Sequence, residues 1–166
     1  MTSITNWSVD AVPSTHPDAR ALLPGYVEDL SRRYYGRPVT ERELEEALAA
    51  HLREELTPPD GAVLLARDQD GRARGSTGVR LLAPGVAELK RVYVTEEGRG
   101  RGCGGRLLAA AEDWAREHGA SLLRLDTRSD LVEARALYAR HGFAEVEPYN
   151  DNPYAQHWYE KRLGNR

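Results

Sequence analysis

The chain has little of several residue types that mark particular classes of protein. Cys103 is the single cysteine among 166 residues, which excludes an intrachain disulfide framework and a zinc site built from several cysteines. No apolar run reaches the roughly eighteen residues of a membrane-spanning helix, and the N-terminal stretch lacks the basic and apolar regions of a secretion signal. We therefore expect a cytoplasmic protein with no membrane partner and no bound metal.

Excess basic charge is also missing. The formal net charge is -3, so the chain has no overall basic footprint of the kind that nucleic-acid-binding proteins carry. Hydrophobic residues make up 40% of the sequence, which at this length is enough for one well-buried core. We expect one domain over residues 1–166 and no nucleic-acid partner.

The N-terminal third predicts two helices. Apolar residues recur at helical spacing from Pro17 onward, and Pro24-Gly25 is expected to kink or split this first helix. Thr40 and Glu43 form a capping-box pattern that opens a second helix, which ends before Pro58-Pro59.

The rest of the chain predicts a mixed α/β domain. Residues 63–66, 73–82 and 86–94 read as three antiparallel strands joined by tight turns, and residues 7–12 as an edge strand. Two helices, at about 107–115 and 131–138, then alternate with short strands at 122–126, 143–146 and 156–160. A strand-helix-strand crossover of this length implies one parallel pairing in an otherwise antiparallel sheet.

A glycine-rich stretch, residues 97–106, lies between the third predicted strand and a helix. Glycines remove the Cβ atoms that keep a ligand away from the backbone, so consecutive N–H groups can converge on an anion at the positive end of the helix. Residues 99–106 contain four glycines and three arginines. Because each glycine costs about 1 kcal/mol relative to alanine in regular structure, a phosphate-bearing ligand explains this stretch better than a plain turn does.

A dinucleotide-binding oxidoreductase domain is one alternative. Residues 100–105 fit the pattern G-x-G-x-x-G, and Asp126 lies about twenty residues further on, where a Rossmann domain binds ribose. However, residues 95–99 separate this pattern from its strand, and too little chain follows Asp126 for the remaining strands and helices.

Two segments resemble the GNAT superfamily of acyl-CoA N-acyltransferases. Residues 99–104 (Arg-Gly-Arg-Gly-Cys-Gly) resemble its pyrophosphate loop, and Leu137-Tyr138 with His141-Gly142-Phe143 resembles its later helix-to-strand motif. The resemblance implies a GNAT-like fold, which is a mostly antiparallel mixed sheet with a parallel, splayed pair at its centre, flanked by helices. It also implies a variable helical part at residues 1–60 and an acyl-CoA-binding core at residues 61–166.

The resemblance also implies how acetyl-CoA is bound as cosubstrate. The family holds the pantetheine arm on the strand before the loop and the pyrophosphate on the loop amides. The implied binding residues are Val92, Tyr93, Val94, Arg99, Gly100, Arg101, Gly102, Cys103, Gly104 and Gly105. Arg99 is expected to contact phosphate or brace the loop, and Arg101 to lie nearer solvent. Cys103 is interpreted as a packing residue, since no histidine lies at a spacing that would make it a nucleophile.

Two catalytic residues follow from the same resemblance. Tyr138 matches the family's general acid, whose phenol protonates the departing thiolate. Glu88 resembles an acidic residue that several members use as a base. A salt bridge to Lys90 is the alternative, because strand periodicity puts Glu88, Lys90 and Val92 on one face. Weaker candidates for the base are Asp126, His157 and Glu43.

The expected activity is N-acetylation of a primary amine, on a small molecule or a protein, by direct attack in a ternary complex. A non-catalytic acyl-CoA-binding or sensing domain is the alternative from another class. The acceptor site is expected to be bordered by Tyr26, Tyr34, Tyr35 and residues 149–154. Family habit makes a homodimer possible.

Overall fold

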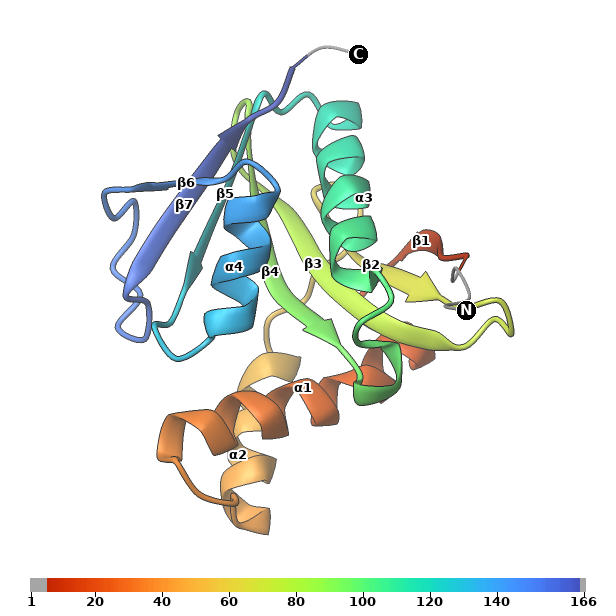
Figure 1. The fold of residues 1–166 in the computed structure, drawn as a ribbon, viewed down its shortest axis with the longest axis vertical. Coiled ribbons are helices and arrows are strands. Elements are labelled where there is room, and N and C mark those ends of the chain that lie inside the picture. The colour runs from red at the N-terminus through yellow and green to blue at the C-terminus, as the bar shows by residue number, and fades with distance from the viewer. Residues whose placement is uncertain (1–5, 165–166) are drawn as a thin grey trace.

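The computed structural model describes residues 6–164. In this part of the chain seven strands form one sheet, in the order β1-β2-β3-β4-β5-β7-β6 (Figure 1). The strands are β1 (Ser8–Val12), β2 (Gly61–Arg67), β3 (Ala73–Ala83), β4 (Val86–Val94), β5 (Leu122–Thr127), β6 (Ala144–Val146) and β7 (His157–Arg162). Neighbouring strands are antiparallel except β4 and β5, which confirms the mixed sheet. One parallel pair is too few for a Rossmann domain, so the dinucleotide-binding alternative was wrong.

Helices cover both faces of this sheet. α3 and α4 lie over one face, whereas α1 and α2 lie on the other side, near the end of β4 (Figure 1). The helices are α1 (Pro17–Tyr35), α2 (Glu41–Leu52), α3 (Cys103–Glu117) and α4 (Val132–Arg140), with a 3-10 turn, η1 (Glu96–Gly98), before α3.

β2 is buried on both faces. Ala62, Leu64 and Ala66 belong to the main core with residues of α3, while Val63 and Leu65 pack in a smaller cluster with residues of α1. Successive strand residues point to opposite faces, so a continuous apolar run suits a strand that is covered on both sides. The two clusters attach the N-terminal helices and the C-terminal helices to the same sheet.

Helix α1 is continuous through Pro24-Gly25, so the expected split was wrong. It runs from Pro17 to Tyr35 and begins with the His16 side chain accepting a hydrogen bond from the Asp18 N–H. Proline removes one intrahelical hydrogen bond, and packing of the helix on the sheet compensates for it. A Cβ atom on Gly25 would lie 2.6 Å from the Tyr93 hydroxyl of β4, which shows how closely the two elements meet there.

Helix α2 begins with the predicted capping box. The Thr40 hydroxyl accepts from the Glu43 N–H at 3.1 Å, and the Glu43 carboxylate accepts from the Thr40 N–H at 2.9 Å. Arg37 pairs with the same carboxylate and, with the Thr40 backbone, lowers the pKa of Glu43 to about 2. Glu43 is therefore a capping residue on the surface.

β4 carries a bulge that changes which residues share a face. Arg91 has φ 55, and the pairing with β3 shifts register there, so that Arg91 and Val92 lie opposite a single β3 residue. Tyr93 then packs against Tyr26 of α1, whereas Val92 packs into the core beneath α3. The expectation that Glu88 and Val92 share one face was wrong because of this bulge.

β4 and β5 separate soon after they begin. Their parallel register consists of the pairs Val86 with Leu122, Ala87 with Leu123 and Glu88 with Arg124. β4 continues to Val94 and β5 to Thr127, but beyond these three pairs the two strands do not pair with each other. The two strands are the expected splayed pair, and a space opens between their C-terminal ends.

Candidate active site

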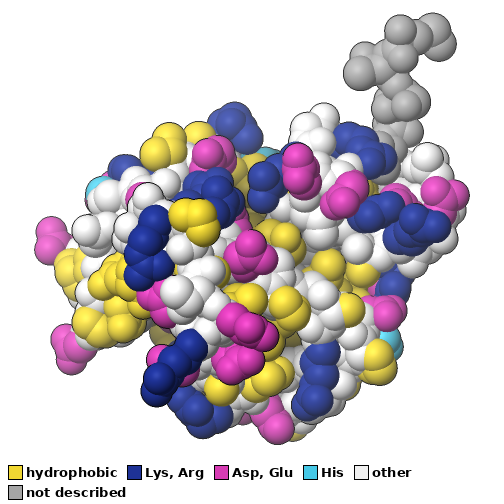
Figure 2. All heavy atoms as spheres, turned by 90° about the horizontal axis from the view of Figure 1, so that it is seen from below, with side chains coloured by type: hydrophobic (Ala, Val, Ile, Leu, Met, Phe, Trp, Pro, Cys, Tyr) yellow, Lys and Arg dark blue, Asp and Glu magenta, His cyan; other side chains and the backbone are white. Residues whose placement is uncertain are grey.

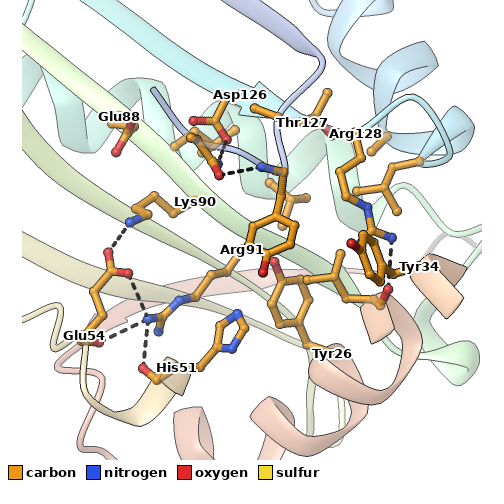
Figure 3. A pocket seen from close by; sticks show the side chains of 18 of the residues that line it. Tyr26, Tyr34, His51, Glu54, Glu88, Lys90, Arg91, Asp126, Thr127 and Arg128 are labelled. Atoms are coloured by element: carbon orange, nitrogen blue, oxygen red, sulfur yellow. Dashed lines mark hydrogen bonds and ion pairs between the residues drawn. The ribbon is translucent and has the colours of Figure 1, made fainter. Parts of the chain in front are cut away.

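A cavity of about 700 Å³ lies where β4 and β5 separate (Figure 3). Its volume is in the usual range for small-molecule sites. Its walls come from α1, α2, β4, β5 and α4, and from the β6–β7 loop (residues 147–156). Seven charged side chains line it, namely Glu54, Arg80, Glu88, Lys90, Arg91, Asp126 and Arg128.

Glu88, the predicted base, lines this cavity with both carboxylate oxygens hydrogen-bonded. It is the last β4 residue paired to β5, and its side chain is 4% exposed. Oε1 accepts from the Arg80 guanidinium at 2.8–2.9 Å, and Oε2 accepts from the Tyr149 hydroxyl at 2.8 Å. Burial and the charge of Glu88 raise the pKa of Tyr149, so this phenol stays a donor. The ion pair of Glu88 is therefore with Arg80 and not with Lys90.

Asp126 lies on β5 just beyond the last residue that pairs with β4. Its carboxylate accepts from the Asn150 side-chain amide at 2.7 Å and from the Asn152 side-chain amide at 3.1 Å. Trp158 holds Asn150 in place through a hydrogen bond of 2.9 Å. Within residues 6–164 no cationic side chain pairs with Asp126. The structure thus brings a weak sequence candidate into the cavity beside Glu88.

Tyr138 lines the cavity from α4. Its ring packs edge-on to Phe143, with centroids 5.9 Å apart, and against Tyr159 at 6.0 Å. Burial raises the pKa of Tyr138, so it is a neutral phenol at neutral pH. Its hydroxyl has no hydrogen-bond partner in the described part of the chain. This side chain therefore has a proton that it can donate into the cavity.

His51 and Arg91 form a corner of the site that the sequence analysis missed. The Arg91 guanidinium donates to the backbone carbonyls of His51 at 3.0 Å and Glu54 at 3.1 Å, where α2 ends. The His51 Nδ1 lies 2.9 Å from the Ala47 carbonyl, and its ring lies edge-on to Tyr26. Burial lowers the pKa of His51, so Nδ1 carries the proton and Nε2 is an acceptor. Helical spacing gave no signal that set His51 apart.

Tyrosines form part of the cavity lining, among them Tyr26, Tyr34 and Tyr35, which the sequence analysis expected at the acceptor site. Tyr34 of α1 and Tyr154 of the β6–β7 loop are 56% and 61% exposed, and their rings pack edge-on at 5.8 Å. Tyr35 packs on Tyr34 at 5.3 Å. We call Tyr34, Tyr35 and Tyr154 the tyrosine rim. It joins α1 to the β6–β7 loop across the cavity mouth.

The glycine loop leads from the end of β4 into α3. Gly100 and Gly102 have φ 72 and 79, a left-handed region that glycine adopts without strain. Gly102 is the N-cap of α3, which has no side-chain cap and no acidic residue in its first turn. The first N–H groups of a helix have no intrahelical acceptor, and the helix dipole favours an anion there. This helix start fits a pyrophosphate group.

Gly104 and Gly105 serve the packing of α3 on α4. A Cβ atom on Gly104 would lie 2.9 Å from Leu137, and one on Gly105 would lie 3.0 Å from His141. The nearest atoms are the ends of these two side chains, so a larger residue at either position would require them to shift. The two glycines therefore allow close packing between the first turn of α3 and the segment that carries Tyr138.

The loop arginines brace the backbone. Arg99 donates to the Val94 carbonyl at 3.2 Å, which ties the loop to the end of β4. The guanidinium of Arg101 donates to the Glu97 carbonyl and lies over the Trp7 ring, 5.9 Å from its centroid. Both side chains belong to exposed residues, so Arg101 lies near solvent as expected.

The model of the acetyltransferase (GNAT) family matches residues 25–143. The chain belongs to this family. An uncharacterized N-acetyltransferase of Schizosaccharomyces pombe is 34% identical over 152 residues, which cover 90% of each chain. Aminoglycoside N(6')-acetyltransferase type 1 of Serratia marcescens is 33% identical over 106 residues, or 59% of this chain and 73% of that protein. The solved structure of an inferred acyl-CoA N-acyltransferase of Klebsiella pneumoniae is 27% identical, with a TM-score of 0.72 over 95% of this chain and 98% of that one.

Two candidates for the base of a GNAT acetyltransferase lie outside the cavity. His157 pairs with Glu145 at 2.8 Å and with the Ser129 hydroxyl at 2.9 Å. Glu43 caps α2, as described above. Neither lines the cavity, so of the four base candidates named from the sequence, Glu88 and Asp126 are the two that do.

The face that carries α1 and α2 has charges of both signs (Figure 2). Basic and acidic side chains alternate over it, and hydrophobic side chains gather between them. No helix within residues 6–164 is long and apolar enough to cross a membrane. The same residues contain no group of three or more histidine, cysteine, aspartate or glutamate side chains arranged to hold a metal ion.

Cys103 is inside the core. It is 2% exposed, and its Sγ lies against Gly75 of β3, where a Cβ atom would be 2.7 Å away. Burial raises the pKa of the Cys103 thiol to about 11. A buried thiol with so little thiolate is a poor nucleophile.

We expect Cys103 of the folded protein to react with Ellman's reagent at about pH 8 roughly 100-fold more slowly than a free thiol, since its thiolate fraction is that much smaller. Unfolding in guanidinium chloride should release one reactive thiol per chain. Cys103→Ala should release none, which controls for any other group that reacts with the reagent. Fast labelling of the folded chain would contradict a packing role.

Proposed function

We propose that the protein is an acetyl-CoA-dependent N-acetyltransferase that acts on a primary amine by direct attack in a ternary complex. The observation that carries this proposal is the position of the glycine loop relative to the cavity. The glycine loop and the cavity both adjoin the unpaired end of β4. A CoA molecule whose pyrophosphate lies on the loop would run along this strand end and present its thioester to the cavity.

The residues of this strand end fit acetyl-CoA. The uncapped first turn of α3 offers N–H groups to the pyrophosphate. The edge of β4 that faces β5 is unpaired from Leu89 onward, which leaves backbone groups of Val92, Tyr93 and Val94 for the pantetheine arm. Cys103, Gly104 and Gly105 would contribute N–H groups and not side chains. Arg99 and Arg101 would hold the loop in shape around the phosphates.

Three events make up the transfer. The amine gives up a proton, its nitrogen forms a bond to the thioester carbonyl carbon, and the carbon–sulfur bond breaks to release CoA thiolate. Tyr138 would protonate this thiolate, since its phenol is neutral and its hydroxyl donates no hydrogen bond to another described residue. A backbone N–H near Val94 would stabilise the carbonyl oxygen as it gains negative charge.

Glu88 is the proposed proton acceptor for the amine, directly or through water. Glu88 lies where β4 and β5 begin to separate. Because Arg80 and Tyr149 occupy its oxygens, the proton would reach it after a shift of the Tyr149 hydroxyl. Asp126 and His51 Nε2 are the alternatives within the cavity.

Replacement of Gly102 by alanine should weaken acetyl-CoA binding about tenfold or more. A Cβ atom at φ 79 costs roughly 1–2 kcal/mol, and relief of that strain would turn the loop N–H groups away from the phosphates. Gly71→Ala is the matched control, because Gly71 has φ 77 in the distant β2–β3 turn. Gly71→Ala should lower the stability of the fold and leave acetyl-CoA binding unchanged. Calorimetric titration tests both, and failure of the unchanged protein to bind acetyl-CoA would refute the proposed function.

Tyr138→Phe should lower the turnover number about 100-fold and leave the affinity for acetyl-CoA within about twofold, because only the proton donor is lost. Tyr159→Phe is the control, since Tyr159 is the adjacent buried phenol, bonded to Arg135 and outside the cavity lining. The turnover number of Tyr159→Phe should be close to that of the unchanged protein. Release of free thiol with a panel of amines measures the rate. A protein that binds acetyl-CoA but acetylates no amine is instead a sensing domain.

Glu88→Gln should lower the turnover number about 100-fold across pH 6.5–9, because the amide still accepts the Tyr149 hydrogen bond but takes up no proton. Glu54→Gln removes another carboxylate of the cavity, one that pairs with Lys90, and should have a small effect. If Glu88→Gln keeps more than half of the rate, Glu88 has a structural role and the base is another group.

A further inference from the structure

The cavity has one carboxylate that is not already paired with a cation. Glu54 pairs with Lys90 and lies 3.7 Å from Arg91, and Glu88 pairs with Arg80. Asp126 is held by two neutral amides, and no lining cation reaches it in the described part of the chain. The cavity therefore offers a single free negative charge to a cationic ligand.

Four cationic side chains line the cavity together with Asp126, and three of them are ion-paired: Arg80 with Glu88, Lys90 with Glu54, and Arg128 with Asp130. Figure 3 shows Lys90 and Arg91 on the side of Glu54, and Arg128 beside Tyr34 on the opposite side. A second ammonium group on the ligand would find no further carboxylate among the described lining residues that lacks a cationic partner. A buried charge without a partner is costly, which selects against polyamines.

Aromatic rings make up much of the remaining lining. Five of the eight tyrosines of the chain lie in it, namely Tyr26, Tyr34, Tyr35, Tyr138 and Tyr154. Asp126 lines the same cavity as these rings. An exposed aromatic rim next to a single carboxylate favours a flat apolar body with one positive charge.

We propose that the acceptor is an aromatic monoamine whose ammonium pairs with Asp126 while its ring lies against Tyr26 and the tyrosine rim. The substrate class rests on the N-acetyltransferase function proposed above. Its distinctive feature is selection by charge number, because Asp126 can pair with one ammonium and the described lining residues offer no second carboxylate without a cationic partner.

The proposal is tested by calorimetric binding to the full chain in the presence of CoA, which requires no turnover. The probe is 2-phenylethylamine. Two matched compounds remove one property each, since 2-cyclohexylethylamine lacks the aromatic ring and 2-phenylethanol lacks the ammonium. Spermidine and kanamycin supply several ammonium groups. We expect 2-phenylethylamine to bind about tenfold or more tightly than each of the other four.

Three variants locate the contacts. Asp126→Asn should weaken binding of 2-phenylethylamine about tenfold or more, whereas Asp151→Asn should not change it. Asp151 is an exposed residue of the same loop region that does not line the cavity, so its loss changes the net charge equally. Tyr34→Leu, at an exposed position that folding tolerates, should weaken binding of 2-phenylethylamine and leave that of 2-cyclohexylethylamine nearly unchanged.

The outcomes separate this proposal from the general function. Tighter binding of spermidine or kanamycin, or equal binding by Asp126→Asn and Asp151→Asn, would overturn the substrate class even if acetyl transfer occurs. Binding of 2-phenylethylamine at Asp126 without acetylation would instead support the site and refute the N-acetyltransferase function.

Discussion

The rest of the structure depends on the early end of pairing between β4 and β5. Strands that stay paired would fill the space that the cavity occupies, and would leave no free edge on β4. β4 also carries a bulge at Arg91, with φ 55, a few residues after its pairing with β5 ends. A non-glycine residue in that region is strained. The guanidinium of the same residue binds the carbonyls at the end of α2, so the strand distortion and the N-terminal helices support each other.

The same split positions the β6–β7 loop, which has no regular structure of its own around residues 147–156. Tyr149 binds Glu88 of β4, and the amides of Asn150 and Asn152 bind Asp126 of β5. Buried carboxylates need such partners, because an unsatisfied buried charge is costly. The loop is therefore ordered by the very groups that face the cavity. Any ligand that competes for Glu88 or Asp126 also changes how firmly this loop is held.

Much of this arrangement could be predicted from the sequence, because it is encoded locally. Thr40 with Glu43 predicted the start of α2, and the order strand, glycine loop and helix was predicted for β4 and α3, although α3 begins at Cys103, before the expected residue 107. What local patterns could not predict was set by distant residues. Helix α1 continues through Pro24, and Gly25 there lies against Tyr93 of the distant strand β4. The alternation of strand residues between the two faces of the sheet is interrupted at the bulge at Arg91. Glu88 pairs with Arg80 on the neighbouring strand, β3.

The glycine loop combines two physical roles that its motif does not distinguish. Gly100 and Gly102 are needed for backbone conformation, whereas Gly104 and Gly105 are needed because α4 approaches closely. Leu137, which contacts Gly104, is the neighbour in sequence of Tyr138. The small residue at position 104 therefore lets the α4 residue next to Tyr138 pack directly on the first turn of α3. The glycine pattern therefore serves the packing of the segment that carries Tyr138 as well as the conformation of the loop, and a side chain at residue 104 would require Leu137 to change position even with the loop conformation intact.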